Sequence, residues 1–74
     1  ANPEDLDVRY QLGVQYTNTG QFREAMEQLI AILQKDLNHG DGATKRILLD
    51  SIASLGKGDP LAVEYQRKLY SLLY

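Results

Sequence analysis

Apolar residues recur every three or four positions along most of the chain, and glycines interrupt the pattern. Between Leu12 and Leu33 two such runs are separated by a single break at Thr19-Gly20. In the second run the apolar positions fall within one broad arc of a helical wheel: Phe22, Ala25, Met26, Leu29, Ile30, Ile32 and Leu33. A glycine at the break suits the left-handed residue that ends many helices. The pattern predicts a helical hairpin over about 4–36, with helices near 4–18 and 21–36.

A glycine and an alanine stand at facing positions of this predicted hairpin. Gly13 lies inside the first helix, where glycine costs about 1 kcal/mol relative to alanine, so a packing reason for it is expected. Gly13 and Ala25 would let the two antiparallel helices approach closely. Tyr16, Phe22 and Leu29 would then fill the space around the contact.

The second half of the chain predicts another hairpin, over about 41–73. Leu55-Gly56 repeats the break of Thr19-Gly20 at a separation of 36 residues. We expect a loop over 37–40, with Asp41 capping a helix that ends near 55. Asp59-Pro60 should open the last helix as cap and first-turn proline. Across both hairpins we expect the most buried residues to be Leu12, Tyr16, Ala25, Leu29, Leu48, Ile52, Leu61 and Tyr65.

Composition excludes several classes of function. The chain has 74 residues, no cysteine and a net charge of −2, so disulfides and thiolate metal sites are excluded within it. It has no basic block, which argues against nucleic acid and anionic membrane as partners. No apolar run approaches the ~18 residues of a membrane span, and the first residues lack signal-peptide character.

The first hairpin resembles the tetratricopeptide repeat, which has a period of about 34 residues. The matching positions are Leu12-Gly13, Tyr16, Gly20, Phe22 and Ala25. Arg9 stands in place of the usual tryptophan, Leu29 in place of the late aromatic and Leu37 in place of the closing proline. The resemblance implies an all-α fold of two antiparallel helical hairpins (four helices), a tetratricopeptide-repeat-like α-solenoid fragment forming one domain over 1–74.

The start of the chain can be interpreted in two compatible ways. Asn2-Pro3 is a helix cap with a first-turn proline, or Pro3 is the closing proline of a preceding repeat. Fewer than three repeats seldom stand alone, because each unit buries its face on a neighbour. We therefore expect this chain to be the C-terminal part of a longer protein.

The second half resembles the C-terminal segment of the YbbN-type bacterial thioredoxin-like co-chaperones, the chaperedoxins. The matching stretches are Asp41-Gly42, 48–56, Asp59-Pro60-Leu61, 65–70 and Leu72-Leu73-Tyr74. In that family tetratricopeptide-like repeats follow a thioredoxin-like domain, which this chain does not include. The resemblance implies a cytoplasmic bacterial protein and an association with the chaperonin GroEL.

No catalytic or cofactor motif stands out. A serine–histidine–acid set could be assembled only from Ser51, Ser54 or Ser71 with His39, and no nucleophile motif surrounds these serines. We expect His39 to be solvated or to cap a helix. Asp36, His39 and Asp41 are a poor metal-ligand set. The sequence thus predicts a protein that is not an enzyme and has neither metal nor cofactor.

Two surfaces are candidates for binding a protein. In the last helix Val63, Arg67, Tyr70 and Tyr74 lie on the side opposite the predicted core face, where the closing helix of a solenoid is normally polar. Aromatic residues and arginine are enriched in binding hot spots, so we interpret these four residues as a docking stripe. The alternative is that Tyr70 and Tyr74 fold over the last turn and shield it.

The second candidate surface is the inner groove of the repeats, with Tyr10, Val14, Arg46 and Asp50. Some relatives bind a chaperone's C-terminal carboxylate there with a lysine and an asparagine, and Tyr10 and Val14 occupy those positions here. The clamp is therefore absent, and an ordinary solvated face is an equal alternative.

Two functions follow from these surfaces. The first is a non-catalytic interaction module that docks a chaperonin, GroEL by resemblance, or a client protein. The alternative is a structural spacer or self-association unit with no external partner. In that case apolar residues on the outer side of the first hairpin, such as Val8, Ile30 and Ala31, would be exposed and could form a homodimer.

Overall fold

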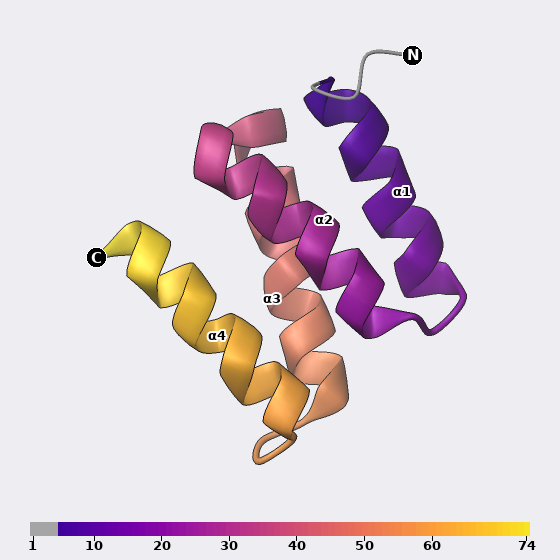
Figure 1. Ribbon diagram of the computed structural model, residues 1–74, viewed down its shortest axis with the longest axis vertical. Helices are drawn as coiled ribbons and strands as arrows, with labels where there is room; N and C mark the ends of the chain where they lie inside the picture. The colour runs from indigo at the N-terminus through magenta and orange to yellow at the C-terminus, as the bar shows by residue number, and fades with distance from the viewer. Residues whose placement is uncertain (1–4) are drawn as a thin grey trace.

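The chain folds into four α-helices joined by short turns (Figure 1). The computed structural model describes residues 5–74. The helices are α1 (Leu6–Asn18), α2 (Phe22–Lys35), α3 (Ala43–Leu55) and α4 (Pro60–Leu73), with a short 3₁₀ helix, η1 (His39–Gly42), between α2 and α3. No β-strand occurs within residues 5–74. The predicted all-α fold of two hairpins is confirmed.

Aspartates cap the first and last helices. The Asp59 carboxylate accepts hydrogen bonds from the backbone N–H of Leu61 (2.9 Å) and Ala62 (3.3 Å), as predicted. Asp5 does the same for α1, accepting from the N–H of Asp7 at 2.9 Å. The first helix therefore begins at Leu6 rather than at 4. The interpretations of Asn2-Pro3 concern residues outside the described range.

The predicted cap of α3 is wrong. Asp41 lies in η1 with φ of +54°, and the residue before α3 is Gly42, with φ of +91° and no side-chain cap. The chain passes here through consecutive left-handed residues from Gly40 to Gly42, and the residue at the cap position has no side chain that could accept a hydrogen bond. The turn at Gly20, with φ of +79°, has the positive φ that was expected.

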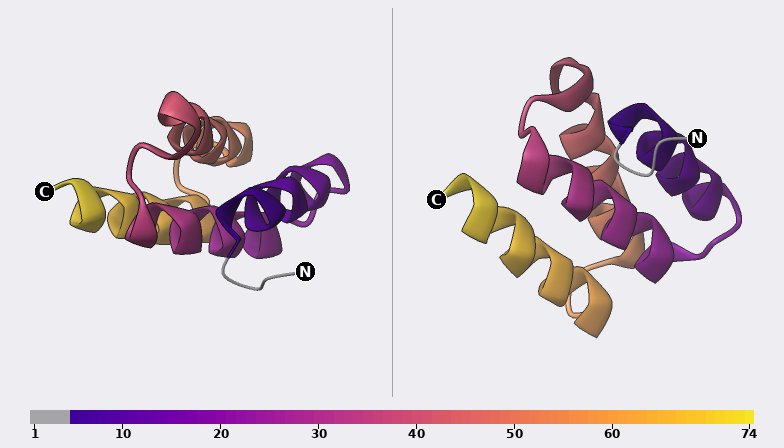
Figure 2. Two further views of the ribbon diagram at one scale, coloured as in Figure 1. Left: turned by 90° about the horizontal axis from the view of Figure 1, so that it is seen from above. Right: turned by 45° about the horizontal axis from the view of Figure 1, so that its top comes forward.

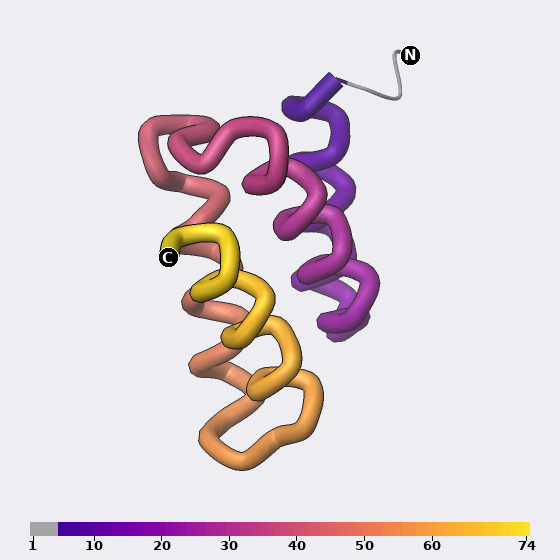
Figure 3. The backbone as a smooth tube through the Cα atoms, turned by 60° about the vertical axis from the view of Figure 1, so that its left-hand side comes forward, coloured from indigo at the N-terminus to yellow at the C-terminus, as the bar shows by residue number. Residues whose placement is uncertain are grey.

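The helices form a two-layer arrangement with α2 at its centre. α2 contacts α1, α3 and α4, and α2 and α4 lie side by side with α3 across them (Figure 2). The tight turns α1–α2 and α3–α4 lie at one end of the molecule, and the connection through η1 lies at the other (Figure 3). α1 and α3 consequently run in the same direction.

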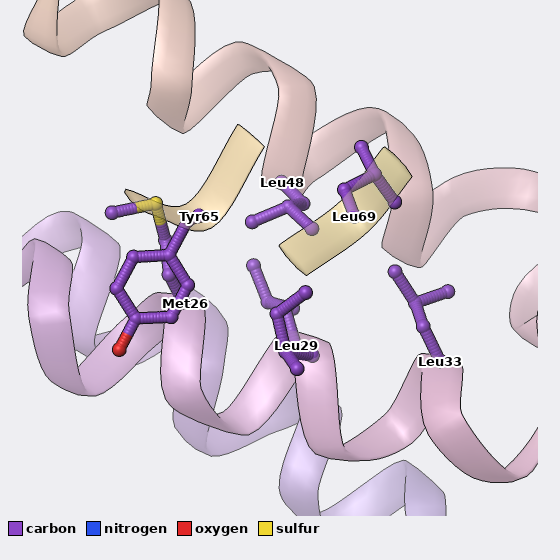
Figure 4. Packing of buried hydrophobic residues seen from close by; sticks show 7 residues of the cluster. Met26, Leu29, Leu33, Leu48, Tyr65 and Leu69 are labelled. Carbon is purple, nitrogen blue, oxygen red and sulfur yellow. The ribbon is translucent and has the colours of Figure 1, made fainter. Parts of the chain in front are cut away.

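The core lies between α2, α3 and α4 (Figure 4). Leu48 of α3 points toward Leu29 of α2, and Leu69 of α4 lies beside them. The buried cluster consists of Met26, Leu29, Ile30, Leu33, Leu48, Tyr65 and Leu69. The predicted burial of Ala25, Leu29, Leu48 and Tyr65 is confirmed, and each is 0% exposed. Tyr16, Ile52 and Leu61 are only half-buried.

Two expectations about the first hairpin are wrong. Leu12 is 37% exposed rather than buried, because α1 packs closely on α2 and no further helix within residues 5–74 covers its other flank. Ile30 is only 6% exposed rather than facing outward, because α4 packs on that side of α2. The side of the first hairpin left uncovered therefore belongs to α1.

Gly13 brings α1 and α2 close together, as the sequence predicted. It is buried, and a Cβ atom added to it would lie 3.1 Å from Cδ2 of Leu29 and 3.5 Å from the carbonyl oxygen of Ala25. In the first hairpin the backbone of α1 at Gly13 therefore packs directly against α2.

Among the described residues, no helix is both long enough and apolar enough to cross a membrane.

Candidate protein-binding surfaces

The outward side of α4 carries the four residues of the predicted docking stripe. Asp59 and Pro60 start the helix, and 3.6 residues per turn place positions 63, 67, 70 and 74 along one line. Val63 is 38% exposed, Tyr70 47% and Tyr74 98%. The opposite side of the same helix is buried. The stripe is therefore continuous and open to solvent.

The two tyrosines of the stripe contact each other. Their ring centroids lie 6.1 Å apart in an edge-to-face arrangement, which is a favourable geometry for aromatic pairs. The Tyr70 hydroxyl also accepts a hydrogen bond from Nε2 of Gln66 at 3.2 Å. Since Tyr74 remains almost fully exposed, it does not shield the last turn.

Arg67 lies at the rim of a hollow between α2 and α4. The hollow has a volume of about 450 Å³ and is lined by Glu27, Ile30, Ala31, Gln34, Arg67, Lys68, Ser71 and Leu72. Lys68 pairs with Glu64 at 3.4 Å. Within residues 5–74 no carboxylate forms an ion pair with Arg67. Its guanidinium group is thus available to an acceptor on another molecule.

Tyr65 fixes how α4 sits on α2, and thereby which side of α4 faces outward. Its hydroxyl donates a hydrogen bond to the carboxylate of Glu27 on α2, and the Lys68 ammonium lies 4.6 Å from its ring centroid. Burial, together with the hydrogen bond to Glu27, raises the pKa of the Tyr65 hydroxyl well above its usual range. The residue stays neutral and keeps its bond at physiological pH.

The inner groove is present as a hollow of about 220 Å³ between α1 and α3. Its lining is Val14, Thr17, Asn18, Ile47, Asp50, Ser51 and Ser54. Val14 and Asp50 therefore lie where the sequence predicted, whereas Tyr10 and Arg46 do not line the hollow. Thr17 and Ser51 donate their hydroxyls to carbonyl oxygens of their own helices. Asn18, Asp50 and Ser54 remain as its polar groups.

His39 has a role that sequence reasoning missed. Its Nε2 lies 3.0 Å from Oδ1 of Asp7, its Nδ1 lies 2.7 Å from Oγ1 of Thr44, and its ring contacts Tyr10 at 5.8 Å between centroids. The side chain is 12% exposed. The expectation that His39 is solvated or caps a helix is therefore wrong. The side chain instead connects α1 to the start of α3. Asp7 lies 32 residues away, so no local pattern could have indicated the pair.

The contacts of Asp7, His39 and Thr44 form a carboxylate–imidazole–hydroxyl series like those of some hydrolases. Thr44, however, is 0% exposed, so a substrate cannot reach its hydroxyl. The three residues therefore form a contact between α1 and the start of α3.

Comparison with known proteins identifies the repeat. A family model described as tetratricopeptide repeat matches residues 1–74. An uncharacterized protein of Haemophilus influenzae is 37% identical over 68 residues, which cover 92% of this chain. The same residues cover 31% of that relative, so the chain spans about a third of its length. The match over all of 1–74 includes both hairpins.

Proposed function

We propose that this chain, a member of the tetratricopeptide repeat family, binds a partner protein through the docking stripe on α4. Proteins of this family generally mediate protein–protein interactions and are generally non-catalytic. The observation that carries the choice of surface is the exposure of Val63, Tyr70 and Tyr74 on α4 and at its end.

The chemistry of the stripe supports this proposal. Tyrosine contributes a large contact area with only two side-chain torsions to immobilise, and the edge-to-face contact already limits the rings of Tyr70 and Tyr74. Arg67 adds a cation that no carboxylate within 5–74 neutralises. Such a surface suits a partner with an apolar patch bordered by acidic groups.

The candidate partner is the chaperonin GroEL, and it comes from the resemblance to the thioredoxin-like co-chaperones. In that interpretation the chain is the C-terminal repeat region of a cytoplasmic bacterial co-chaperone. The inner groove is the next surface to consider, because Val14, Asp50 and their neighbours form a real hollow.

The test is capture of purified chaperonin by the full-length protein. The variant Tyr70→Ser plus Tyr74→Ser is compared with wild type, after circular dichroism shows that its helices persist. Val14→Ser plus Asp50→Ser is the matched control, since it removes two side chains from the inner groove. We expect capture to be lost only in the tyrosine variant. Undiminished capture by that folded variant would show that the docking stripe does not bind the chaperonin.

A second candidate function is a spacer that stacks on other copies or repeats. The exposed Leu12 favours it, because a large apolar side chain at a repeat position normally packs on a neighbouring unit. A protein with this function alone would capture no chaperonin, whichever surface is altered.

A further inference from the structure

The hollow between α2 and α4 lies on a different side of the molecule from the inner groove. All of its lining residues belong to α2 and α4. These two helices lie side by side, and α3 crosses them on their other side (Figure 2). The volume of about 450 Å³ is within the range of about 300–1,000 Å³ that is typical of ligand sites. The hollow is therefore large enough to hold side chains of another protein.

Positive charge is in excess around this hollow. The charged residues that line it are Glu27, Arg67 and Lys68. The Glu27 carboxylate accepts a hydrogen bond from the Tyr65 hydroxyl. Glu64 pairs with Lys68 at 3.4 Å and with Arg23 at 3.8 Å. Three cations thus stand beside two carboxylates that already have partners, although the net charge of the whole chain is −2.

The polar side chains without a partner gather at one end of the hollow. Within residues 5–74, Arg67 has no ion pair, and neither Gln34 nor Ser71 forms a side-chain hydrogen bond. Arg67 precedes Ser71 by about one helical turn, so both residues lie on the same side of α4. α2 and α4 begin at the same end of the molecule (Figure 3), so Gln34 and Ser71 lie beyond Glu27 in the direction of both helices. An acceptor bound among these groups is kept apart from the Glu27 carboxylate.

The rest of the lining is apolar. Ile30 forms its buried part, at 6% exposure, and Ala31 and Leu72 are half-buried. This apolar part adjoins the polar end, because Leu72 follows Ser71 directly. The hollow therefore suits a ligand that presents an acceptor and an aliphatic group close together.

We propose that the hollow between α2 and α4 binds an acidic side chain of the partner protein, together with an aliphatic side chain next to it in the partner's sequence. The carboxylate accepts two N–H groups of the Arg67 guanidinium, which is a strong and directional pairing, and the hydroxyl of Ser71. The aliphatic side chain packs on Ala31 and Leu72. This inference rests on the proposed function, because Arg67 belongs to both surfaces and a partner on the docking stripe reaches the hollow beside it.

The charges favour a carboxylate over a phosphate group. One excess positive charge matches one carboxylate. A phosphorylated side chain carries a charge of about −1.5 to −2, so it would add negative charge near the exposed carboxylate of Glu27. The ligand is accordingly an unmodified glutamate or aspartate.

The experiment is a nuclear magnetic resonance titration of the labelled full-length protein with a blocked tetrapeptide, alanyl-leucyl-glutamyl-alanine. Peptides with glutamine or phosphoserine in place of the glutamate are the comparison ligands. We expect the glutamate peptide to shift the amide signals of Ala31 and Ser71, while those of Val14 and Ile47 in the inner groove stay unchanged. The glutamine peptide should bind about fivefold more weakly, because it lacks the ion pair with Arg67.

Two arginine variants test the assignment. Arg67→Gln should bind the glutamate peptide as weakly as wild type binds the glutamine peptide. Arg46→Gln is the matched control, because it removes the same charge from an exposed arginine that does not line the hollow, and it should bind like wild type. Both side chains are exposed, so both variants should keep their helices by circular dichroism.

Three results would overturn the proposal. The first is a glutamate peptide that leaves the signals of Ala31 and Ser71 unchanged at its highest soluble concentration. The second is equal affinity of wild type and Arg67→Gln for that peptide. The third is tighter binding of the phosphoserine peptide than of the glutamate peptide.

Chaperonin capture separates this proposal from the proposed function. The variant Tyr70→Ser plus Tyr74→Ser keeps the lining of the hollow, so it should bind the glutamate peptide like wild type. If this variant still captures chaperonin while peptide binding depends on Arg67, the docking stripe is wrong and the hollow is supported. If it loses capture while the peptide fails to bind wild type, the hollow is wrong and the docking stripe is supported.

Discussion

The two hairpins follow the same repeat, yet they bury equivalent positions very differently. Leu48 is fully buried and Leu12 is 37% exposed, although each leucine stands eight residues before the glycine of its own hairpin turn, Gly56 and Gly20 respectively. Gly13 is buried, whereas its equivalent Leu49 is 40% exposed. Burial at a repeat position thus depends on which helices flank it as much as on the side chain.

Gly13 also explains why the first hairpin is the tighter of the two. It lets α1 approach Leu29 and Ala25 of α2 closely, and α1 and α2 share a more extensive contact than α3 and α4. With a leucine at position 49 the second hairpin lacks this close approach. Its two helices instead leave a hollow beside Ile52 and Val63.

The largest expected effect comes from removing equivalent leucines. Leu48→Ala should lower the free energy of unfolding by about 2–5 kcal/mol, because it leaves a cavity in the shared core. Leu12→Ala should cost about 1 kcal/mol or less, since part of that side chain is already in water. Urea denaturation of the two variants at low protein concentration measures the difference. Equal losses of unfolding free energy in the two variants would contradict the difference in burial between the two hairpins.

The second prediction concerns the close helix contact. Gly13→Val should destabilise the fold by about 1–3 kcal/mol, because the added atoms meet Leu29. Leu49→Val, at the equivalent and exposed position, should change stability by less than about 1 kcal/mol. Thermal unfolding followed by circular dichroism checks both. A neutral Gly13→Val variant would show that α1 and α2 do not need this approach.

The third prediction compares the starts of the two second helices. Asp59 caps α4, whereas Gln21 precedes α2 without a side-chain cap bond. Asp59→Ala should therefore cost about 0.5–2 kcal/mol in the free energy of unfolding. Gln21→Ala should have little effect under the same denaturation protocol. The reverse order would contradict the capping described for α4.

The smallest effect is expected from pH. Tyr65 stands where the first hairpin has Leu29, and its pKa is raised in the folded state by burial and by the bond to Glu27. Unfolded tyrosine ionises near pH ~10, so the unfolded state loses its proton first. Above that pH the stability should fall, by about 0.8 kcal/mol at pH ~10.5. Equilibrium unfolding of wild type and Tyr65→Phe between pH 8 and about 10.5 measures this loss of stability. If the free energy of unfolding of Tyr65→Phe fell with pH as steeply as that of wild type, ionisation of Tyr65 would not be the cause.

Local patterns in the sequence predicted most of the fold. Apolar periodicity, the turn at Gly20 and the cap at Asp59 each depend on residues within a few positions of one another. The predictions for Leu12, Ile30 and His39 were wrong because the surroundings of these residues depend on distant segments. No helix within 5–74 covers the outer side of α1 at Leu12, α4 covers Ile30, and Asp7 of α1 contacts His39. The periodicity of α4 placed the stripe residues on its outward side, while their role in binding stays a prediction.

The most direct test of the proposed binding surface is a nuclear magnetic resonance titration of the labelled chain with purified chaperonin. Val63, Tyr70 and Tyr74 report on the stripe, and Val14 and Ile47 report on the inner groove. We expect the side-chain signals of the stripe residues to broaden first, at ratios where the groove signals are unchanged. Early broadening of Val14 and Ile47, with the stripe unaffected, would contradict the assignment of binding to α4.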